Sequence, residues 1–263
     1  MFETYLQEGL RGGRLVRWSE RSMPLKIYIA PFRWYKAKDN ASSYRYISMV
    51  HRAIDTWSRA TQGKIRFQIV NDFMSSQVNL DWKRIDRKAL GYCTTEPKGD
   101  TIFTADIQIG LSDGIIHSKY MDEDEVYHTI LHEVGHALGL GHSPNKSDIM
   151  YTPHQYGVVN LSSGDIASIN WLYKLPIGST VKELNQKYQI NATSIDEIIA
   201  KISKGDKKGQ FENVKNSIVI PKRDLQQEQT NIAEINKYNL LLQNIQISPN
   251  LEKYMKKIKM EED

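Results

Sequence analysis

HEVGHALGLGH, residues 132–142, is the stretch that decides the predicted fold of this chain. His132 and His136 are four residues apart, so that on a helix both imidazoles project from the same face, one turn apart. Gly139 permits the chain to turn back after the helix, because glycine adopts positive φ without a steric penalty. Such a turn would bring His142 to the first two histidines, and three imidazoles are a suitable ligand set for Zn²⁺. The stretch therefore predicts a helix, a turn and a metal site.

Glu133 follows the first histidine, where its carboxylate can reach a water on the metal and act as a general base. A bare HExxH pattern also occurs by chance on solvated helices, but Gly139 and His142 at fixed offsets exclude most coincidences. A structural zinc site is the other alternative, although such sites usually fill all four positions with protein ligands, often cysteine. The chain has one cysteine, Cys93, far from this stretch. We therefore predict a catalytic zinc centre.

The eleven residues resemble the zinc-binding signature of the metzincins, a clan that also carries a Met-turn. Ser143, directly after the third histidine, is similar to the residue at this place in the matrixins, the matrix metalloproteinases and their bacterial relatives. Residues 150–153 (MYTP) resemble the matrixin Met-turn, and residues 161–173 resemble the closing helix of a matrixin catalytic domain. The resemblance covers roughly residues 17–174 and favours a matrixin-like protein of bacterial type.

The resemblance implies an α+β fold with a twisted, mostly parallel sheet, a backing helix, an active-site helix and a C-terminal helix. Period-two alternation of apolar residues predicts strands, and a period near 3.6 predicts helices. We therefore expect strands at residues 25–29, 64–70, 77–82 and 101–109, and helices at 42–60, 125–138 and from Ser162 to Tyr173. The resemblance implies a further strand at residues 89–97.

For function, the resemblance implies a zinc-dependent endopeptidase that hydrolyses peptide bonds of extended protein substrates. His132, His136 and His142 would hold Zn²⁺, and Glu133 would act as the general base on a metal-activated water. Met150 would form a structural floor beneath the metal. Two rival functions remain: a binding module with an inactive metal domain, and a zinc hydrolase of non-peptide amides. The unaltered ligands and base argue against the first rival, and the Met-turn argues against the second.

The resemblance also names candidate substrate-binding residues. Residues 89–97 match the matrixin edge strand, along which a peptide pairs through its backbone, and the candidates there are Leu90, Gly91, Tyr92 and Cys93. For Cys93, an ordinary core cysteine is an equal alternative. Pro153 and Tyr156 would belong to the outer wall of the pocket for an apolar side chain after the scissile bond. His128 is a further pocket candidate, with a fourth imidazole near the metal as the alternative.

The resemblance to matrixins also implies bound structural calcium. Asp113 and the acidic residues 122–125 could supply ligands, but charges that favour the N-terminus of the active-site helix are the simpler interpretation of residues 122–125. The histidine-rich loop of a second zinc site is absent, since His117 stands alone.

Composition limits the partners. The 263 residues are 40% hydrophobic and 25% charged with a net charge of +4, which are ordinary globular values. Without a dense Lys/Arg cluster, nucleic-acid binding is not indicated, and no apolar run of about 18–20 residues predicts a membrane span. The first residues lack a signal-peptide pattern, whereas the resemblance implies a secreted protein, extracellular or in the cell envelope. A missing leader and another export route both stay open.

Three regions are expected along the chain. Residues 1–16 are polar and glycine-bearing and look like a lead-in segment, and residues 17–176 would form the matrixin-like domain. The composition changes after Pro176, and residues 177–263 contain neither histidine nor cysteine. We expect this extension to be mainly helical or partly disordered, with helices near 181–188, 194–202 and 232–245, and with binding of a partner as one role.

Overall fold

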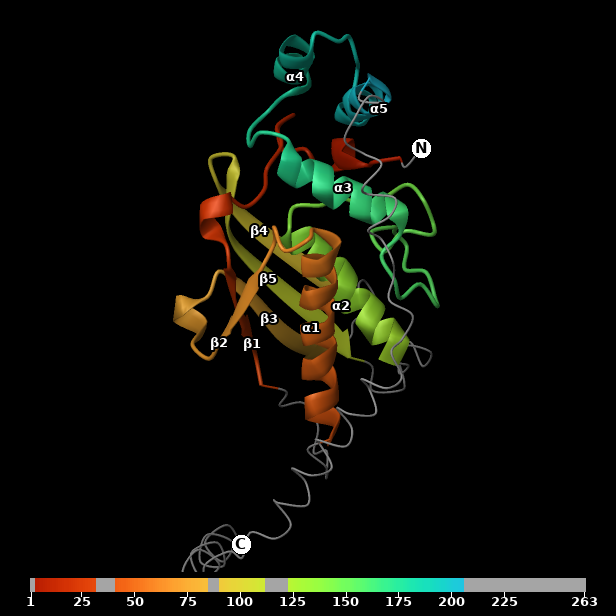
Figure 1. Ribbon diagram of the computed structural model, residues 1–263. Coiled ribbons are helices and arrows are strands. Elements are labelled where there is room, and N and C mark those ends of the chain that lie inside the picture. Colours follow the sequence, from red (N-terminus) through yellow and green to blue (C-terminus); the bar gives the residue numbers. More distant parts are fainter. Residues whose placement is uncertain (1–2, 32–40, 85–89, 112–122, 206–263) are drawn as a thin grey trace, which may run out of the picture. The chain divides into compact units, whose positions relative to one another are not determined.

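The computed structural model describes residues 3–31, 41–84, 90–111 and 123–205 of the chain (Figure 1). Residues up to 206 belong to one compact unit. Its helices are α1 (Ala41–Ala60), α2 (Glu123–Ala137), α3 (Ser163–Lys174), α4 (Val181–Tyr188) and α5 (Ile195–Gly205). Its strands are β1 (Leu25–Ile29), β2 (Phe67–Val70), β3 (Val78–Arg84), β4 (Gly91–Lys98) and β5 (Thr101–Leu111), and three short 3₁₀ helices are η1 (Leu6–Gly9), η2 (Glu20–Ser22) and η3 (Phe73–Ser75).

The five strands form one sheet in the order β2-β1-β3-β5-β4. The pairs from β2 to β5 are parallel, and β4 is antiparallel to β5, with Cys93 opposite Ile107. The predicted α+β fold with a mostly parallel sheet is therefore confirmed, and β4 is an edge strand as expected. Strand β2 begins at Phe67 and not at Lys64. Residues 61–65 form a turn in which Thr61 accepts from Lys64 N and its hydroxyl accepts from Ile65 N.

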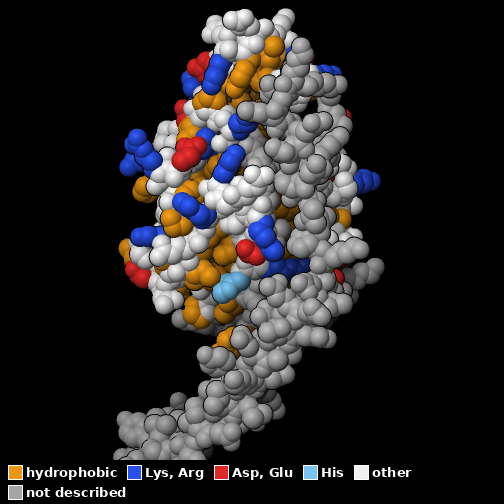
Figure 2. Space-filling model, viewed as in Figure 1, with side chains coloured by type: hydrophobic (Ala, Val, Ile, Leu, Met, Phe, Trp, Pro, Cys, Tyr) orange, Lys and Arg blue, Asp and Glu red, His pale blue; other side chains and the backbone are white. Residues whose placement is uncertain are grey.

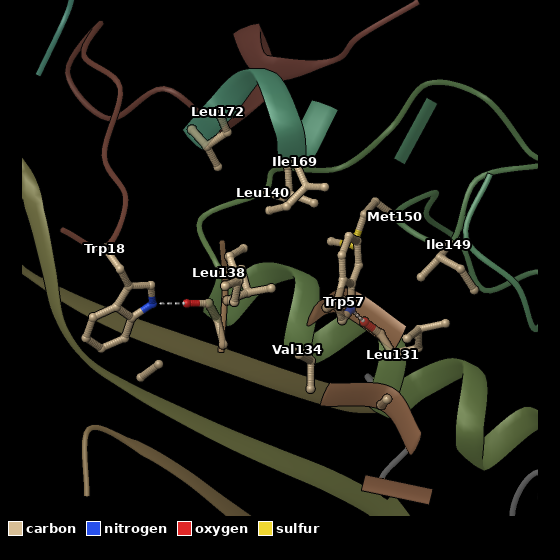
Figure 3. Packing of buried hydrophobic residues seen from close by; sticks show 14 of the residues in the cluster. Trp18, Trp57, Leu131, Val134, Leu138, Leu140, Ile149, Met150, Ile169 and Leu172 are labelled. Atoms are coloured by element: carbon tan, nitrogen blue, oxygen red, sulfur yellow. Dashed lines mark hydrogen bonds between the residues drawn. The ribbon is translucent and has the colours of Figure 1, made fainter. Parts of the chain in front are cut away.

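Helices α1 and α2 pack against each other over one face of the sheet (Figure 1). The alternation along the strands places Ile27, Leu80 and Ile107 in the core between the layers. Two fully buried tryptophans join the layers to α2, as Figure 3 shows: Trp18 Nε1 donates to Ala137 O at 2.8 Å and Trp57 Nε1 donates to Leu131 O at 3.0 Å. Helix α2 is thus fixed at its middle and at its end.

The segments outside residues 17–176 also contribute to this unit. Tyr5, Leu6 and Leu15 are buried in the same apolar cluster as the sheet, and so are Ile195 and Ile198 of α5. Helices α4 and α5 lie close to where the sequence predicts them, whereas the helix predicted at 232–245 lies outside the described residues. The domain boundaries after residues 16 and 176 remain predictions.

The surface of the described residues mixes side chains of different kinds. On the face seen in Figure 2, lysine and arginine side chains are interspersed with apolar, neutral and acidic ones. Within the described part of the chain, no helix has the length and apolar character needed to cross a bilayer.

Candidate metal centre

Helix α2 ends where Gly139 was predicted to end it. Gly139 has φ +102°, Leu140 N donates to Gly135 O at 3.1 Å, and Gly139 N donates to His136 O at 2.9 Å. This pair of bonds is a Schellman motif, which satisfies carbonyls that a helix end leaves without partners. The loop then leads back to His142.

The three histidines converge as the sequence predicts. Their ligand atoms lie within 4.8 Å of one another, and Nε2 of His136 is 3.2 Å from Nε2 of His142. Two nitrogens bound to one tetrahedral zinc ion at about 2.0–2.1 Å would lie roughly 3.4 Å apart. The spacing therefore fits Zn²⁺.

Backbone carbonyls fix the protonation of two of the rings. His132 Nδ1 lies 2.7 Å from Ile149 O, and His136 Nδ1 lies 2.8 Å from Leu140 O. A carbonyl oxygen can only accept, so each Nδ1 must carry the proton, and each Nε2 keeps its lone pair for a metal. Burial lowers the pKa of His132 to about 3 and that of His136 to about 4. Both rings are thus neutral at physiological pH.

Glu133 of α2 is buried and lies directly against the edge strand β4. Burial raises the pKa of its carboxyl to about 8, and a cation held by the histidines would favour the carboxylate and lower that value. A methyl group added to Gly91 would lie 2.6 Å from Glu133 Oε1. The bare backbone of Gly91 therefore lets β4 pass directly beside the carboxylate.

The Met-turn packs against α2 between the two helical histidines. Met150 and Trp57 are fully buried and lie beside each other against this helix (Figure 3). Gly135, between the two helical histidines, has no room for a Cβ: Met150 Sδ would overlap it, and Trp57 Cζ2 would lie 3.0 Å away. The absence of a side chain at Gly135 thus lets the methionine approach the helix.

We expect Gly135→Ala to destabilise the protein by about 1–3 kcal/mol through overpacking. In an open helix the same change would stabilise by about 1 kcal/mol, so the sign of the effect tests the contact. Urea unfolding measures it, and a double-mutant cycle with Met150→Ala is the control. In the Met150→Ala background the added methyl should cost much less, because only Trp57 Cζ2 remains close to it. An equal cost in both backgrounds would contradict the contact.

Asp165 of α3 holds the Met-turn from the other side. Its Oδ2 accepts from Ile149 N at 2.9 Å and from Ser162 N at 2.8 Å, and its Oδ1 accepts from the Tyr5 hydroxyl at 2.6 Å. Ser162 and Asp165 also form the capping box of α3. Ser162 and Asp165 indicate the start of this helix in the sequence, whereas no sequence signal indicates the link of Asp165 to Tyr5 and to the Met-turn.

Hydrogen bonds from Glu125 and His128 connect the segment after the Met-turn to helix α2. Glu125 Oε2 is hydrogen-bonded to His154 Nε2, and Glu125 Oε1 accepts from Gly157 N at 3.0 Å. His128 Nδ1 lies 2.6 Å from Val158 O, and its ring centroid is 4.1 Å from that of His154. Glu125 was interpreted as a helix-end charge; it is buried and ties this segment to α2.

The predicted substrate-binding residues belong to three segments: the edge strand β4 with Leu90 before it, helix α2, and the segment after the Met-turn. Gly91 faces α2, Cys93 and Leu90 are half-buried, and the Tyr92 side chain is exposed. His128 is buried, one turn before His132 with its ring stacked 6.2 Å away, whereas Pro153 and Tyr156 are exposed on the segment after the Met-turn. Glu123, Asp124 and Glu125 are in the first turn of α2, and Asp113, His117 and Asp122 lie outside the described residues.

Comparison with protein families gives one match. A sequence model of the matrixin family, a family of peptidases, matches residues 30–174, which is more than half of the chain.

Individual relatives match a shorter part. A probable matrix metalloproteinase of Invertebrate iridescent virus 3 is 39% identical over 71 residues, 26% of this chain and 19% of the relative. A putative matrix metalloproteinase of Trichoplusia ni ascovirus 2c is 42% identical over 76 residues, which are 28% of this chain and 15% of the relative. Macrophage metalloelastase of Rattus norvegicus is 38% identical over 63 residues, which are 23% of this chain and 14% of the relative. The chain thus spans less than a fifth of the length of these relatives.

Proposed function

The chain belongs to the matrixin family, and on that basis we propose that it is a zinc-dependent endopeptidase acting on extended protein substrates. The observation that carries the proposal is the convergence of three imidazoles beside a buried carboxylate. Zinc enzymes of this type use three protein ligands and leave one position open. His132, His136 and His142 would be these ligands, and Glu133 the general base.

Each group of the proposed site would have its own role in the hydrolysis. A bound Zn²⁺ would supply Lewis acidity, which polarises the scissile carbonyl and makes water more acidic. Glu133 would take the proton of the attacking water on a carboxylate oxygen and pass it to the departing amine. Ile149 O and Leu140 O would keep His132 and His136 in the tautomer that leaves Nε2 free.

The edge strand β4 is the proposed platform for the substrate. Among the described residues only β5 pairs with β4, so its other edge can pair with an extended peptide. Arg11 donates to Thr95 O at 3.0 Å and so occupies one carbonyl of β4. The edge left for a peptide therefore runs from Gly91 to Thr94, beside Glu133.

The segment after the Met-turn would form the wall of the pocket for the first side chain after the scissile bond. His128, Pro153 and Tyr156 are the proposed lining residues, and the Glu125–His154 pair would hold the wall in place. An extracellular location is part of the proposal, because matrixins are commonly extracellular.

Metal removal tests the proposal. We expect one zinc per chain by elemental analysis, and cleavage of a quenched peptide library that stops after dialysis against a chelator. Addition of one equivalent of Zn²⁺ should restore cleavage, since the three ligand positions are already aligned. His51→Ala, which removes an exposed histidine of α1, is the control and should retain both metal and activity. Undiminished cleavage by metal-free protein would refute the proposal.

A further inference from the structure

The α4–α5 hairpin lies outside the residues that match the matrixin family model, yet its helix α5 contacts η1. Figure 1 shows the hairpin beyond the end of α3. Asp196, in the first turn of α5, forms the contact. Its Oδ1 accepts from Leu6 N at 2.8 Å and from Thr4 Oγ1 at 2.6 Å, and its Oδ2 accepts from Gln7 N at 3.0 Å. Gln7 Oε1 in return accepts from Ile195 N at 3.0 Å.

These contacts form a reciprocal cap between two helices. The N-cap residue of η1, Tyr5, makes no side-chain cap bond, so Asp196 satisfies the backbone donors at the start of η1. Gln7 satisfies a donor at the start of α5 in the same way. Three buried isoleucines of α5 fasten the helix to the common core: Ile195, Ile198 and Ile199. The hairpin thus fixes the path of residues 4–9.

Residues 4–9 in turn touch the loop that carries the third histidine. A Cβ added to Gly141 would lie 2.6 Å from Gly9 N and 2.7 Å from Glu8 C, so the two backbones are in direct contact beside His142. Tyr5 makes a second connection, through its bond to Asp165 and from there to Ile149 N. Ile149 O holds the ring of His132.

We propose that Asp196 is a positioning residue for the metal centre: it holds residues 4–9 against the His142 loop and the Met-turn. The role of these loops as zinc-binding elements rests on the proposed function, but their positioning does not. The Asp196 carboxylate accepts from Thr4, Leu6 and Gln7, so its effect on the histidines passes through η1.

Asp196→Ala and Glu197→Ala form a matched pair for the test. Both remove one negative charge from the first turn of α5. Among the described residues, however, the Glu197 carboxylate bonds to Thr193 and Lys201 of the hairpin itself. Hydrogen exchange of the full metal-free chain, followed by mass spectrometry, reports on residues 139–151. We expect exchange there to be about tenfold faster in Asp196→Ala, and unchanged in Glu197→Ala.

A zinc-loss measurement complements the exchange experiment. Zinc should leave Asp196→Ala several-fold faster than Glu197→Ala in the presence of a chelator. If Asp196→Ala does not fold, Gln7→Ala, which removes the other half of the cap, should show the same pattern more weakly. Exchange that is faster only in residues 3–9 and in the hairpin, or equally fast in both variants, would overturn the proposal. Because the exchange measurement uses neither metal nor peptide, it stands even if the chain cleaves nothing.

Discussion

Glu133→Gln should slow peptide cleavage at least about a hundredfold while zinc stays bound. Glutamine has the shape of glutamate, but its amide cannot accept the proton of the attacking water. General-base catalysis by a positioned side chain contributes about 10²–10⁴-fold, so kcat should fall by a factor in this range with little change in KM. Steady-state cleavage of a quenched peptide, with zinc content measured on the same sample, checks the prediction.

The stability of this variant provides a separate check. Burial raises the pKa of Glu133 to about 8, which means that the charged carboxylate is costly in the metal-free protein. A neutral glutamine avoids this cost, so the metal-free variant should melt at the same temperature as the wild type or higher. Glu96→Gln, at an exposed position of β4, is the control and should leave cleavage unchanged. A Glu133→Gln enzyme within about tenfold of wild-type activity would exclude Glu133 as the base.

The parts of the site that the sequence predicts are those that depend on local spacing. The four-residue spacing of His132 and His136 determines their common helix face, and Gly139 has the positive φ that the turn requires. Strand positions follow in the same way from alternation, because inward residues such as Ile107 recur at every second place.

The parts that the sequence does not predict depend on contacts between distant residues. Glu125 has the sequence context of a helix-end charge, yet its partners are His154 and Gly157, about thirty positions further along the chain. The polar, glycine-bearing residues 1–16 show no period, although Tyr5 and Leu6 are buried in the core. Periodicity cannot reveal such contacts, since each involves one or two side chains without repetition.

Asp165→Ala should have the largest effect on stability. The carboxylate is fully buried and accepts from the Tyr5 hydroxyl, Ser162 N and Ile149 N, with Met150 N at 3.4 Å. Removing it leaves these donors buried without an acceptor, at a cost of about 1–3 kcal/mol each. The α3 capping box thereby loses one of its two bonds, whereas the Ser162 hydroxyl still accepts from the backbone N of residue 165. Because such costs are not additive, we expect a total of about 3–5 kcal/mol, at the upper end for a single substitution.

Tyr5→Phe separates the hydroxyl from the rest of this network. It removes one donor and leaves Asp165 with its backbone partners, so it should cost only about 1 kcal/mol in urea unfolding. The two variants should also differ at the metal site. Without Asp165 the Met-turn loses the bond at Ile149 N, and the carbonyl of the same residue orients the His132 ring. Zinc affinity should therefore fall further in Asp165→Ala than in Tyr5→Phe. Equal unfolding free energies for the two variants would show that the Tyr5 hydroxyl, and not the Met-turn amides, accounts for the contribution of Asp165.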